Sequence, residues 1–382
     1  MDDFPAGPAS PGPRRPRLTV VIPVHNGGRD LERCLRRLRD SSPGMDYELV
    51  VVDDGSTDGS ARTAGSFGAR VIRHDRPRGP AAARNAGAIA ATAPLVFFLD
   101  ADVAVHPDTL GRALRRFDDD PGLAALFGSY DDRPVAPGLV SQYRNLLHHF
   151  VHQRGRFVDE ARPARTFWTG CGMIRKDVFH AHGGFDPQVY RRPAIEDIEL
   201  GYRISRSGGR IVLARDVLAA HLKRWTFFGM IRTDVFRRGV PWMLLILRSK
   251  AEEHDLNVDR AGRLSVAATG LAGLLTLGSI ARPALGIGAA ACLAAVVVLN
   301  RDFYAFLARK KGPAFAAACL PLHLVYHACC GASVVIATAL WHGRLRRAEA
   351  RATAVGFRRD EPAPAVPKPT PARTRRPSRW PR

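Results

Sequence analysis

A short apolar run that ends in two carboxylates constrains this chain more than any other stretch. Residues 95–99 have the sequence Leu-Val-Phe-Phe-Leu and are followed by Asp100, Ala101 and Asp102. A continuous apolar run of this length is typical of a strand buried on both faces of a parallel sheet. Ligands of open α/β sheets bind where the carboxyl ends of such strands open into a crevice. Two carboxylates one residue apart suit Mg²⁺ or Mn²⁺ as hard oxygen ligands, although Asp-x-Asp alone also describes an Asp-rich turn.

The charge balance limits the partners that this chain is expected to bind. The 382 residues include 57 Lys and Arg against 36 Asp and Glu, which gives a formal net charge of +21. Such a charge suits an anionic membrane, nucleic acid or phosphate-bearing ligands. Much of the excess lies near the two ends, and the middle lacks a basic and aromatic stripe, so nucleic acid is not an expected partner.

Apolar runs alternate with helical patterns in the first hundred residues. Residues 18–23, 47–52, 69–72 and 95–99 predict strands, and apolar residues at helical spacing over 31–38 and 80–91 predict helices between them. This alternation is typical of βαβ units and a mostly parallel sheet flanked by helices, which is an α/β fold. Right-handed crossovers then place three polar clusters along one edge of the sheet, namely His25 and Asn26, Asp53 and Asp54, and Asp100 with Asp102.

The following stretch is less regular. We expect a helix over 140–151, a strand over 167–174 with close backbone approach at Gly170 and Gly172, and a helix over 196–207. Two further strands are expected over 210–213 and 217–221. In and just after the helix expected over 140–151, a solvated polar face explains three histidines better than a metal site does, namely His148, His149 and His152.

The chain after residue 226 is organised by long apolar segments. Residues 227–247 mix aromatic and apolar residues with arginines, which favours an interfacial amphipathic helix over an ordinary core helix. Residues 264–299 contain a single charge, Arg282 beside Pro283, and are long enough for two short membrane helices. Residues 314–341 contain no formal charge and could form a third span, since a span needs roughly 20 residues.

The distribution of basic residues leaves the membrane topology open. The positive-inside rule places both the loop around Lys310 and the basic C-terminal segment in the cytosol. Three full spans would put them on opposite sides. Either one apolar segment is re-entrant or interfacial, or the rule is broken here.

Composition divides the chain into five parts. Residues 1–17 are rich in Pro and Gly, lack the apolar core of a signal peptide and predict a disordered tail. The α/β domain is expected over 18–225, the interfacial helix and linker over 226–260, and two to three transmembrane helices over 261–342. Residues 343–382 predict a basic, Pro- and Arg-rich disordered tail. Six cysteines without a Cys-x-x-Cys pair predict reduced thiols, compatible with a cytosolic main domain.

Five motifs in order resemble one enzyme family. They are Val-Ile-Pro-Val-His-Asn at 21–26, Val-Asp-Asp-Gly-Ser-Thr-Asp at 52–58, Ala-Arg-Asn-Ala-Gly at 83–87, Leu-Asp-Ala-Asp at 99–102 and Glu-Asp-Ile-Glu-Leu at 196–200. Together they resemble family-2 glycosyltransferases of the membrane-anchored bacterial type, which have the GT-A nucleotide-sugar-binding fold. The resemblance covers about residues 18–250. The chain lacks the glycine-rich motifs of dinucleotide-binding and P-loop proteins.

The resemblance implies a donor site and a divalent metal, Mn²⁺ or Mg²⁺. The nucleotide-sugar-binding residues would be Pro23, His25, Asn26, Asp53, Asp54, Arg84, Asn85, Asp100 and Ala101. Asp102 would ligate the metal, with Asp100 shared between ribose and metal and His221 completing the site. The metal would stabilise the negative charge that grows on the departing nucleoside diphosphate.

The resemblance also implies an acceptor site. Asp197, with Glu196 before it, would take the proton of the acceptor hydroxyl, and attack on the face opposite the leaving group would invert the anomeric centre. If the acceptor is an already ionised phosphate, Asp197 would position it instead. The acceptor and donor-sugar side would include Trp168, Gly170, Cys171, Arg224 and Trp225. Most of the Gln-x-x-Arg-Trp pattern of processive members is missing, so polymerisation is not expected.

The expected function is therefore an inverting, metal-dependent glycosyltransferase. It would move a sugar from a nucleotide-diphosphate donor to a lipid-linked or membrane-presented glycan acceptor in cell-envelope synthesis, with a cytosolic catalytic domain on a multi-pass anchor in the inner (cytoplasmic) membrane. The alternatives are a catalytically silent nucleotide-sugar-binding membrane protein, a basic nucleic-acid-binding protein and a membrane scaffold.

Overall fold

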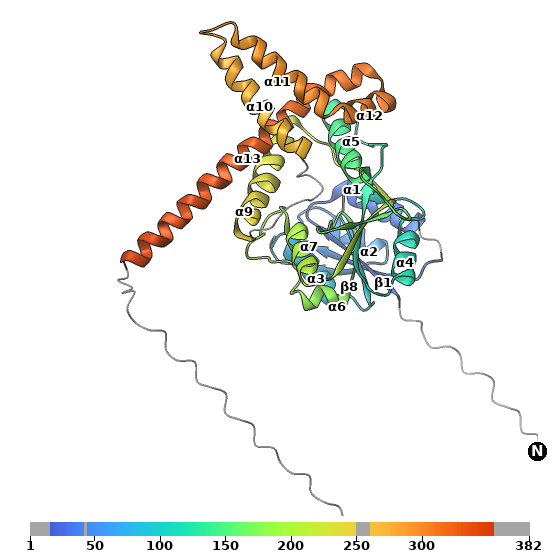
Figure 1. Ribbon diagram of the computed structural model, residues 1–382. Coiled ribbons are helices and arrows are strands. Elements are labelled where there is room, and N and C mark those ends of the chain that lie inside the picture. Colours follow the sequence, from blue (N-terminus) through green and yellow to red (C-terminus); the bar gives the residue numbers. More distant parts are fainter. Residues whose placement is uncertain (1–15, 42–43, 250–259, 355–382) are drawn as a thin grey trace, which may run out of the picture. The chain divides into compact units, whose positions relative to one another are not determined.

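The computed structural model describes residues 16–41, 44–249 and 260–354, with side chains to residue 343 (Figure 1). Most of the two tails expected to be disordered, at 1–17 and 343–382, lies outside these residues. Contacts divide the chain into a unit that ends at Thr338 and a second unit from Ala339 onward. The site and all contacts described below belong to the first unit.

The N-terminal half alternates strands and helices as the sequence predicts. Its elements are β1 (Leu18–Val24), α1 (Gly28–Asp40), β2 (Glu48–Asp53), α2 (Ser60–Ser66), β3 (Arg70–Arg73), α3 (Pro80–Ala90) and β4 (Leu95–Leu99). The four strands pair in parallel in the order β3-β2-β1-β4. The predicted parallel sheet is therefore confirmed for this half of the domain.

The second half adds antiparallel strands, which makes the whole sheet mixed. Its elements are β5 (Val103–Val105), α4 (Thr109–Asp119), β6 (Leu123–Tyr130), α5 (Leu139–Gln153), β7 (Ala161–Ala164), β8 (Cys171–Arg175), α6 (Lys176–Ala181), α7 (Glu196–Arg206) and β9 (Arg210–His221). The sheet continues β4-β8-β6-β9-β5, with β7 beside β9, and β8 runs antiparallel to both β4 and β6.

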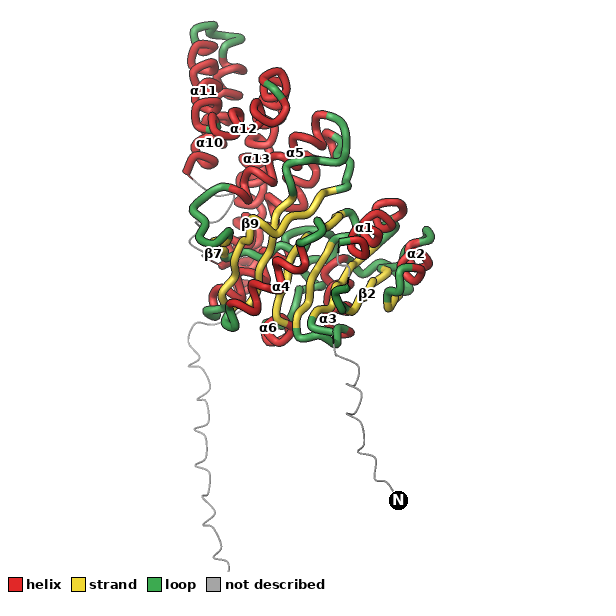
Figure 2. Tube along the Cα trace, turned by 90° about the vertical axis from the view of Figure 1, so that its right-hand side faces the viewer, coloured by secondary structure: helices red, strands yellow, loops and turns green. Residues whose placement is uncertain are grey.

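Helices cover both faces of this sheet (Figure 2). Alternate residues of β4 face opposite sides, so Phe97 joins a core with α1, α2 and α4, whereas Phe98 joins a core with α3, α6 and α7. Both rings are fully buried. The apolar run at 95–99 is thus continuous because this strand is covered on both faces.

Three sequence expectations for the second half need correction. The strand expected over 167–174 begins only at Cys171, since residues 167–170 form a loop whose Phe167 and Trp168 rings turn into the core. The strands expected over 210–213 and 217–221 are one continuous strand, β9. The histidines of α5 do not form a solvated face: His152 is buried and His148 packs against Trp168 with ring centroids 4.8 Å apart.

The helices that follow the sheet are shorter and more broken than expected. The single interfacial helix expected over 227–247 is replaced by α8 (Phe227–Arg232), a π-helical turn η1 (Thr233–Gly239) and α9 (Val240–Ser249). Four helices complete the described chain, namely α10 (Arg260–Gly278), α11 (Leu285–Leu299), α12 (Arg301–Lys311) and α13 (Pro313–Ala354). By length and composition, α10 and residues 313–343 of α13 could each cross a membrane, and α11 with α12 forms a pair bent by 67° that could be a third, broken span.

Candidate active site

The carboxyl ends of β1, β2 and β4 lie side by side, as the sequence predicts. Val24 pairs with Asp53 across β1 and β2, and Val21 pairs with Phe98 across β1 and β4. The residues after each strand therefore emerge at one edge of the sheet. The polar clusters at 25–26, 53–54 and 100–102 share that edge because parallel strands end on the same side.

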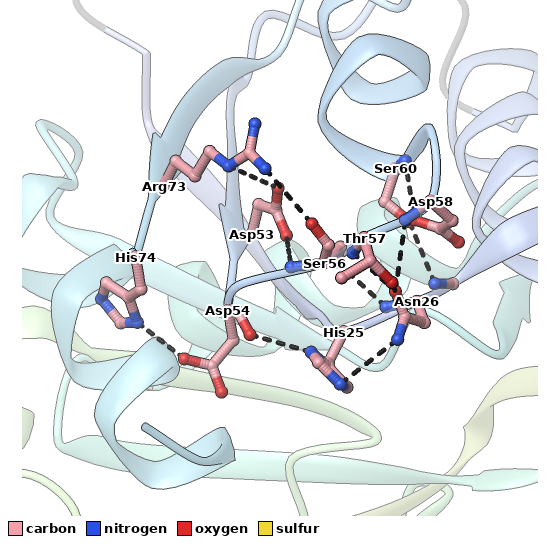
Figure 3. Close-up of polar contacts among 11 residues, drawn as sticks. His25, Asn26, Asp53, Asp54, Ser56, Thr57, Asp58, Ser60, Arg73 and His74 are labelled. Carbon is pink, nitrogen blue, oxygen red and sulfur yellow. Dashed lines mark hydrogen bonds and ion pairs between the residues drawn. The ribbon is translucent and has the colours of Figure 1, made fainter. Parts of the chain in front are cut away.

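The turn after β2 is fastened to the end of β1 by Asn26 (Figure 3). Asn26 has a left-handed backbone with φ of 54°, and its side-chain Oδ1 accepts a hydrogen bond of 2.9 Å from the Thr57 backbone N–H. Asp53 is buried and caps the same turn by accepting from the Ser56 N–H at 2.8 Å. Pro23 lies within β1, opposite Val52. These contacts hold the edge of the predicted base pocket in one shape.

Asp54 holds the loop that leads into α3. Its carboxylate accepts a hydrogen bond from His74 Nδ1 at 2.7 Å, and its backbone oxygen accepts from His25 Nδ1 at 2.9 Å (Figure 3). The carboxylate also accepts from the Arg78 N–H at 2.9 Å and the Gly79 N–H at 2.8 Å. Both carboxylate oxygens thus have protein partners. That Asp54 also accepts from a nucleotide base stays a prediction.

Arg84 joins two acids that are distant in the sequence. This buried guanidinium donates from Nη1 to Glu196 Oε1 and from Nη2 to Asp100 Oδ1, both at 2.7 Å. The two carboxylates raise the pKa of Arg84 against the opposing effect of its burial. Arg84 is therefore engaged with protein acids, and a direct contact with a diphosphate stays a prediction. Its neighbour Asn85 pairs with the backbone N–H and C=O of Phe185 at 3.0 and 2.8 Å.

Asp102 faces His221 across the sheet edge. Asp102 Oδ2 lies 3.7 Å from His221 Nε2, and the register of β5 with β9 places Val103 opposite His221. His221 Nδ1 donates to Asn145 Oδ1 at 2.7 Å, so Nε2 is the ring atom that faces the carboxylate, as a donor in the protonated imidazole and as a lone pair in the neutral one. Burial raises the pKa of Asp102, but the neighbouring His221 more than offsets this, so its pKa is lowered.

This pair fits one side of a divalent cation site. A carboxylate oxygen and an imidazole nitrogen are ligands that Mn²⁺ accepts. Among the residues that the structure describes, no three His, Cys, Asp or Glu side chains gather as a complete metal cage. The donor set therefore suits a cation whose other positions are filled by a diphosphate and water.

Asp197 lies at the start of α7 with its carboxylate held by backbone donors. Oδ2 accepts from the Thr169 N–H at 3.1 Å and from Thr169 Oγ1 at 3.2 Å, and Oδ1 accepts from the Ile198 N–H at 2.9 Å. Burial, followed by the negative charge of Glu196, raises the pKa of Asp197 to about 6. A carboxylate with such a pKa is a competent general base near neutral pH.

The predicted acceptor-side residues divide into two groups. Gly170 lies against the Trp168 ring, since a Cβ on Gly170 would be only 2.3 Å from a ring carbon. Cys171 begins β8 and pairs with Leu99 of β4. The Gly170 C=O accepts a 3.5 Å bond from the Asp100 N–H, so this group lies beside the acid cluster.

The second acceptor-side group follows His221 in the connection that leaves the sheet. The backbone N–H of Trp225 donates to Ser141 Oγ at 2.8 Å. The indole ring of Trp225 lies 5.6 Å from the Arg144 guanidinium and 4.7 Å from Lys223 Nζ. Arg224 is exposed. Trp225 is thus held against α5, and contact of Arg224 or Trp225 with a sugar stays a prediction.

Sequence reasoning missed Asn145, Thr169, Tyr130 and His74. Asn145 is separated from its partner His221 by 76 residues, and Tyr130 stacks on the same imidazole with centroids 4.3 Å apart. Both lie in elements whose apolar pattern indicates only core packing. A polar residue inside the otherwise apolar face of 140–151 was the one available signal for Asn145.

A parallel half-sheet with acids along its carboxyl edge, continued by an antiparallel strand, defines the GT-A class of fold. The sequence profile of glycosyl transferase family 2 matches residues 19–183 of the chain. It is 30% identical over 246 residues to a pre-mycofactocin glycosyltransferase of Mycobacterium tuberculosis, covering 63% of this chain and 50% of that protein. It is 32% identical over 233 residues to a validoxylamine A glucosyltransferase of Streptomyces hygroscopicus subsp. limoneus, covering 53% and 50%.

The chain spans about half the length of these curated relatives. Among solved structures, a mannosyltransferase from Pyrobaculum calidifontis in complex with GDP-Man and Mn²⁺ matches with a TM-score of 0.50 and 21% identity, covering 86% of this chain and 87% of that one. At this identity the likeness concerns the fold.

Proposed function

We propose that this protein is an inverting, metal-dependent hexosyltransferase. It would transfer one sugar from a nucleotide-diphosphate donor to a lipid-linked or membrane-presented acceptor, in the synthesis of cell-envelope glycans at the cytoplasmic membrane. The observation that carries this proposal is the position of Asp197, a half-buried carboxylate with a pKa of about 6 whose neighbour Glu196 is joined through Arg84 to Asp100. The residue beside the proposed base and a donor-side acid are thus linked through one guanidinium.

The reaction forms a bond between the acceptor oxygen and the anomeric carbon while the bond to the diphosphate oxygen breaks. Asp197 would accept the hydroxyl proton, and backbone donors from Thr169 and Ile198 hold its carboxylate in place. Attack from the side opposite the diphosphate inverts the anomeric centre. Asp102 and His221 would hold a Mn²⁺ or Mg²⁺ ion. When bound, the ion supplies positive charge for the leaving diphosphate.

The nucleotide would lie along the edge formed by β1, β2 and β4. The complex of the Pyrobaculum mannosyltransferase contains GDP-Man and Mn²⁺, which supports a nucleotide-sugar donor and a metal for this chain. Pro23, His25, Asn26, Asp53 and Asp54 are the proposed walls of the base and ribose pocket. The apolar C-terminal helices and the net charge of +21 support a membrane-presented acceptor and contact with an anionic membrane.

The test separates catalysis from binding. Asp197→Asn keeps the shape of the side chain and one of its two backbone N–H contacts, since the amide nitrogen cannot accept the other. It removes the basicity, so transfer should fall by roughly 100-fold or more, the range of general-base effects. Donor affinity in the presence of Mn²⁺ should stay within about twofold. A catalytically silent binding protein would instead show no turnover in the wild type across donors and acceptors.

A further inference from the structure

Helices α10 and α11 pack tightly against each other as a hairpin. At its open end Asn300 Nδ2 donates to Ser265 Oγ at 2.8 Å, and at its tip a Cβ on Gly278 would lie 2.8 Å from Leu285. Between these points a Cβ on Gly288 would lie 3.2 Å from Leu275, so the two helices run antiparallel in close contact. The segment 279–284 joins them.

The outer surface of this hairpin is apolar on all sides. The exposed fraction is 68% for Leu274 and 85% for Ile280 at the tip, and five other large apolar side chains of the two helices are at least 50% exposed. Water-soluble proteins rarely leave so much contiguous apolar surface uncovered. Arg282 is the only charged residue in 264–299, whereas Arg260, Arg263 and Arg301 are exposed at the open end. This distribution matches a hydrocarbon layer with anionic headgroups at the open end.

Helix α12 is bound to the catalytic domain. One face repeats at helical spacing and carries Phe303, Phe306, Leu307 and Lys310. The Phe303 and Phe306 rings lie 5.1 and 5.5 Å from the Phe150 ring of α5, and Lys310 forms an ion pair with Asp132 after β6. The chain therefore returns from α11 to the catalytic domain.

The chain also enters the hairpin from the catalytic domain. Trp242 Nε1 in α9 donates to Tyr202 of α7 at 3.1 Å, which holds α9 on that domain. The elements described before and after the hairpin, α9 and α12, therefore both contact the α/β domain.

Helix α13 is apolar and long enough to cross a membrane, yet it lies along α5 of the α/β domain and along η1, which follows that domain. Cys319 packs in one cluster with Tyr143 of α5, and Ala337 packs in another with Val235 of η1. Between them Gly239 leaves no room for a Cβ, which would lie 2.1 Å from Ser333 Oγ. From 316 to 337 the contact extends over about 32 Å, which is as long as the hydrocarbon layer is thick.

The elements that line α13 carry charges that hydrocarbon does not accept. Arg144 of α5 forms a buried ion pair with Asp234 of η1, and Arg232 and Arg238 are exposed beside it. If α13 crossed the bilayer, these arginines would face lipid at membrane depth, which is costly. The packed part of α13 therefore belongs outside the hydrocarbon layer.

We propose that the α10–α11 hairpin is the segment by which the described chain enters the bilayer, and that α13 stays on the catalytic side of the membrane. The loop around Lys310 and the basic C-terminal segment are then on the same, cytosolic side, which satisfies the positive-inside rule. This inference rests on the proposed membrane attachment and not on the proposed sugar transfer.

A matched pair of double variants in the full chain tests this topology. Leu271→Arg with Leu274→Arg changes side chains of the hairpin that are 50% and 68% exposed. Val334→Arg with Val335→Arg changes side chains of α13 that are 41% and 70% exposed. The quantity measured is the fraction of the protein that stays in the membrane after carbonate extraction. We expect this fraction to be at least tenfold lower for the hairpin variant than for the wild type, and unchanged for the α13 variant.

Equal loss from both variants, or a wild type that is absent from membranes, would overturn the proposal. Green fluorescent protein fused after Arg382 should fluoresce and alkaline phosphatase fused there should be inactive, while an active phosphatase would show that α13 spans. Thermal stability and sugar transfer in detergent are measured on the same variants. A topology failure is thereby told apart from misfolding and from failure of the proposed activity.

Discussion

Arg84 organises two acids whose charges would otherwise repel each other. Its guanidinium fork donates to Asp100 on one side and Glu196 on the other, each at 2.7 Å, in a buried position. Removing one partner from such an arrangement leaves a buried charge unpaired and costs about 3–5 kcal/mol. Because Asp100 adjoins the predicted metal ligand and Glu196 adjoins the predicted base, Arg84 couples the geometry of the two.

The raised pKa of Asp197 predicts an acid limb in the pH profile of transfer. The base must be ionised, so the rate should fall about tenfold per pH unit below about pH 6 and level off above it. The same shift means that the folded chain holds this proton more tightly than the unfolded chain between the ordinary aspartate value and about 6. This group therefore favours folding at low pH and loses that contribution as the pH rises through about 6. A rate that stays flat down to pH 4.5 would contradict the assignment.

Asn145 should increase the affinity of the site for Mn²⁺ because it orients His221. Asn145→Leu removes the acceptor of the His221 Nδ1 hydrogen bond, so the imidazole loses its fixed orientation, and the affinity for Mn²⁺ should fall about 10- to 100-fold. Calorimetric titration of Mn²⁺ in the presence of a nucleoside diphosphate measures this.

Asn145→Asp is the matched control, because a carboxylate also accepts from Nδ1 and should retain most of the affinity. His221→Ala sets the value for a lost ligand. If Asn145→Leu binds Mn²⁺ as tightly as the wild type, the orienting role is wrong.

At the scale of elements, the position of α7 decides where the base lies. Gly201 lets this helix contact the loop before β8, since a Cβ there would lie 2.4 Å from the Phe167 backbone nitrogen. The same loop carries Thr169, whose backbone N–H and hydroxyl hold Asp197. Close helix-to-loop packing and placement of the carboxylate are therefore one structural feature.

Gly201→Ala should separate α7 from this loop. Overpacking of a tight contact costs about 1–3 kcal/mol, and the displaced Asp197 should lower transfer further than the loss of stability explains. Chemical denaturation and initial rates measure the two effects. Gly111→Ala in α4 is the control, because its Cβ would meet only ordinary contacts at 3.6 Å or more and should be neutral or stabilising. Equal behaviour of the two variants would refute the packing argument.

At the scale of the whole molecule, a catalytic α/β domain is joined to an apolar hairpin through α5, α12 and α13. Helix α5 contacts both parts, since Asn145 binds His221 of the site and Tyr143 packs with Phe303 of α12, ring centroids 6.2 Å apart. Helix α12 and the part of α13 up to Thr338 are therefore packed onto α5 and η1.

Donor binding should stabilise the whole chain only when a divalent metal is present. A nucleotide sugar at 100 times its Kd with Mn²⁺ adds about 2.7 kcal/mol, which raises the Tm by several degrees. Differential scanning of the detergent-solubilised protein with Mn²⁺ or EDTA measures this. Asp102→Asn should remove the shift, and an equal shift in EDTA would show that the donor site does not need the metal.

Local patterns predicted the elements that carry the donor edge. The apolar runs that became β1, β2 and β4 are strands covered on both faces, and helical spacing marked α1 and α7. β5, β6, β7 and α4 were not predicted. Strands β5 and β7 are only three and four residues long and are defined by pairing with β9. The break of 227–247 at η1 follows from packing against α13, which no periodicity within the segment encodes.

The sequence by itself determined the α/β class, the gathering of three polar clusters along one edge of the sheet, and the resemblance to one family. These depend on short-range spacing and on the fixed direction of parallel strands. Only the tertiary structure decided which acids pair with Arg84, that Asn145 orients His221, and that α13 packs along the catalytic domain. The Arg84–Asp100 pair joins residues 16 positions apart, and the Arg84–Glu196 and Asn145–His221 pairs join residues 112 and 76 positions apart. The apolar faces of α13 suit protein and lipid equally, and packing chooses between them.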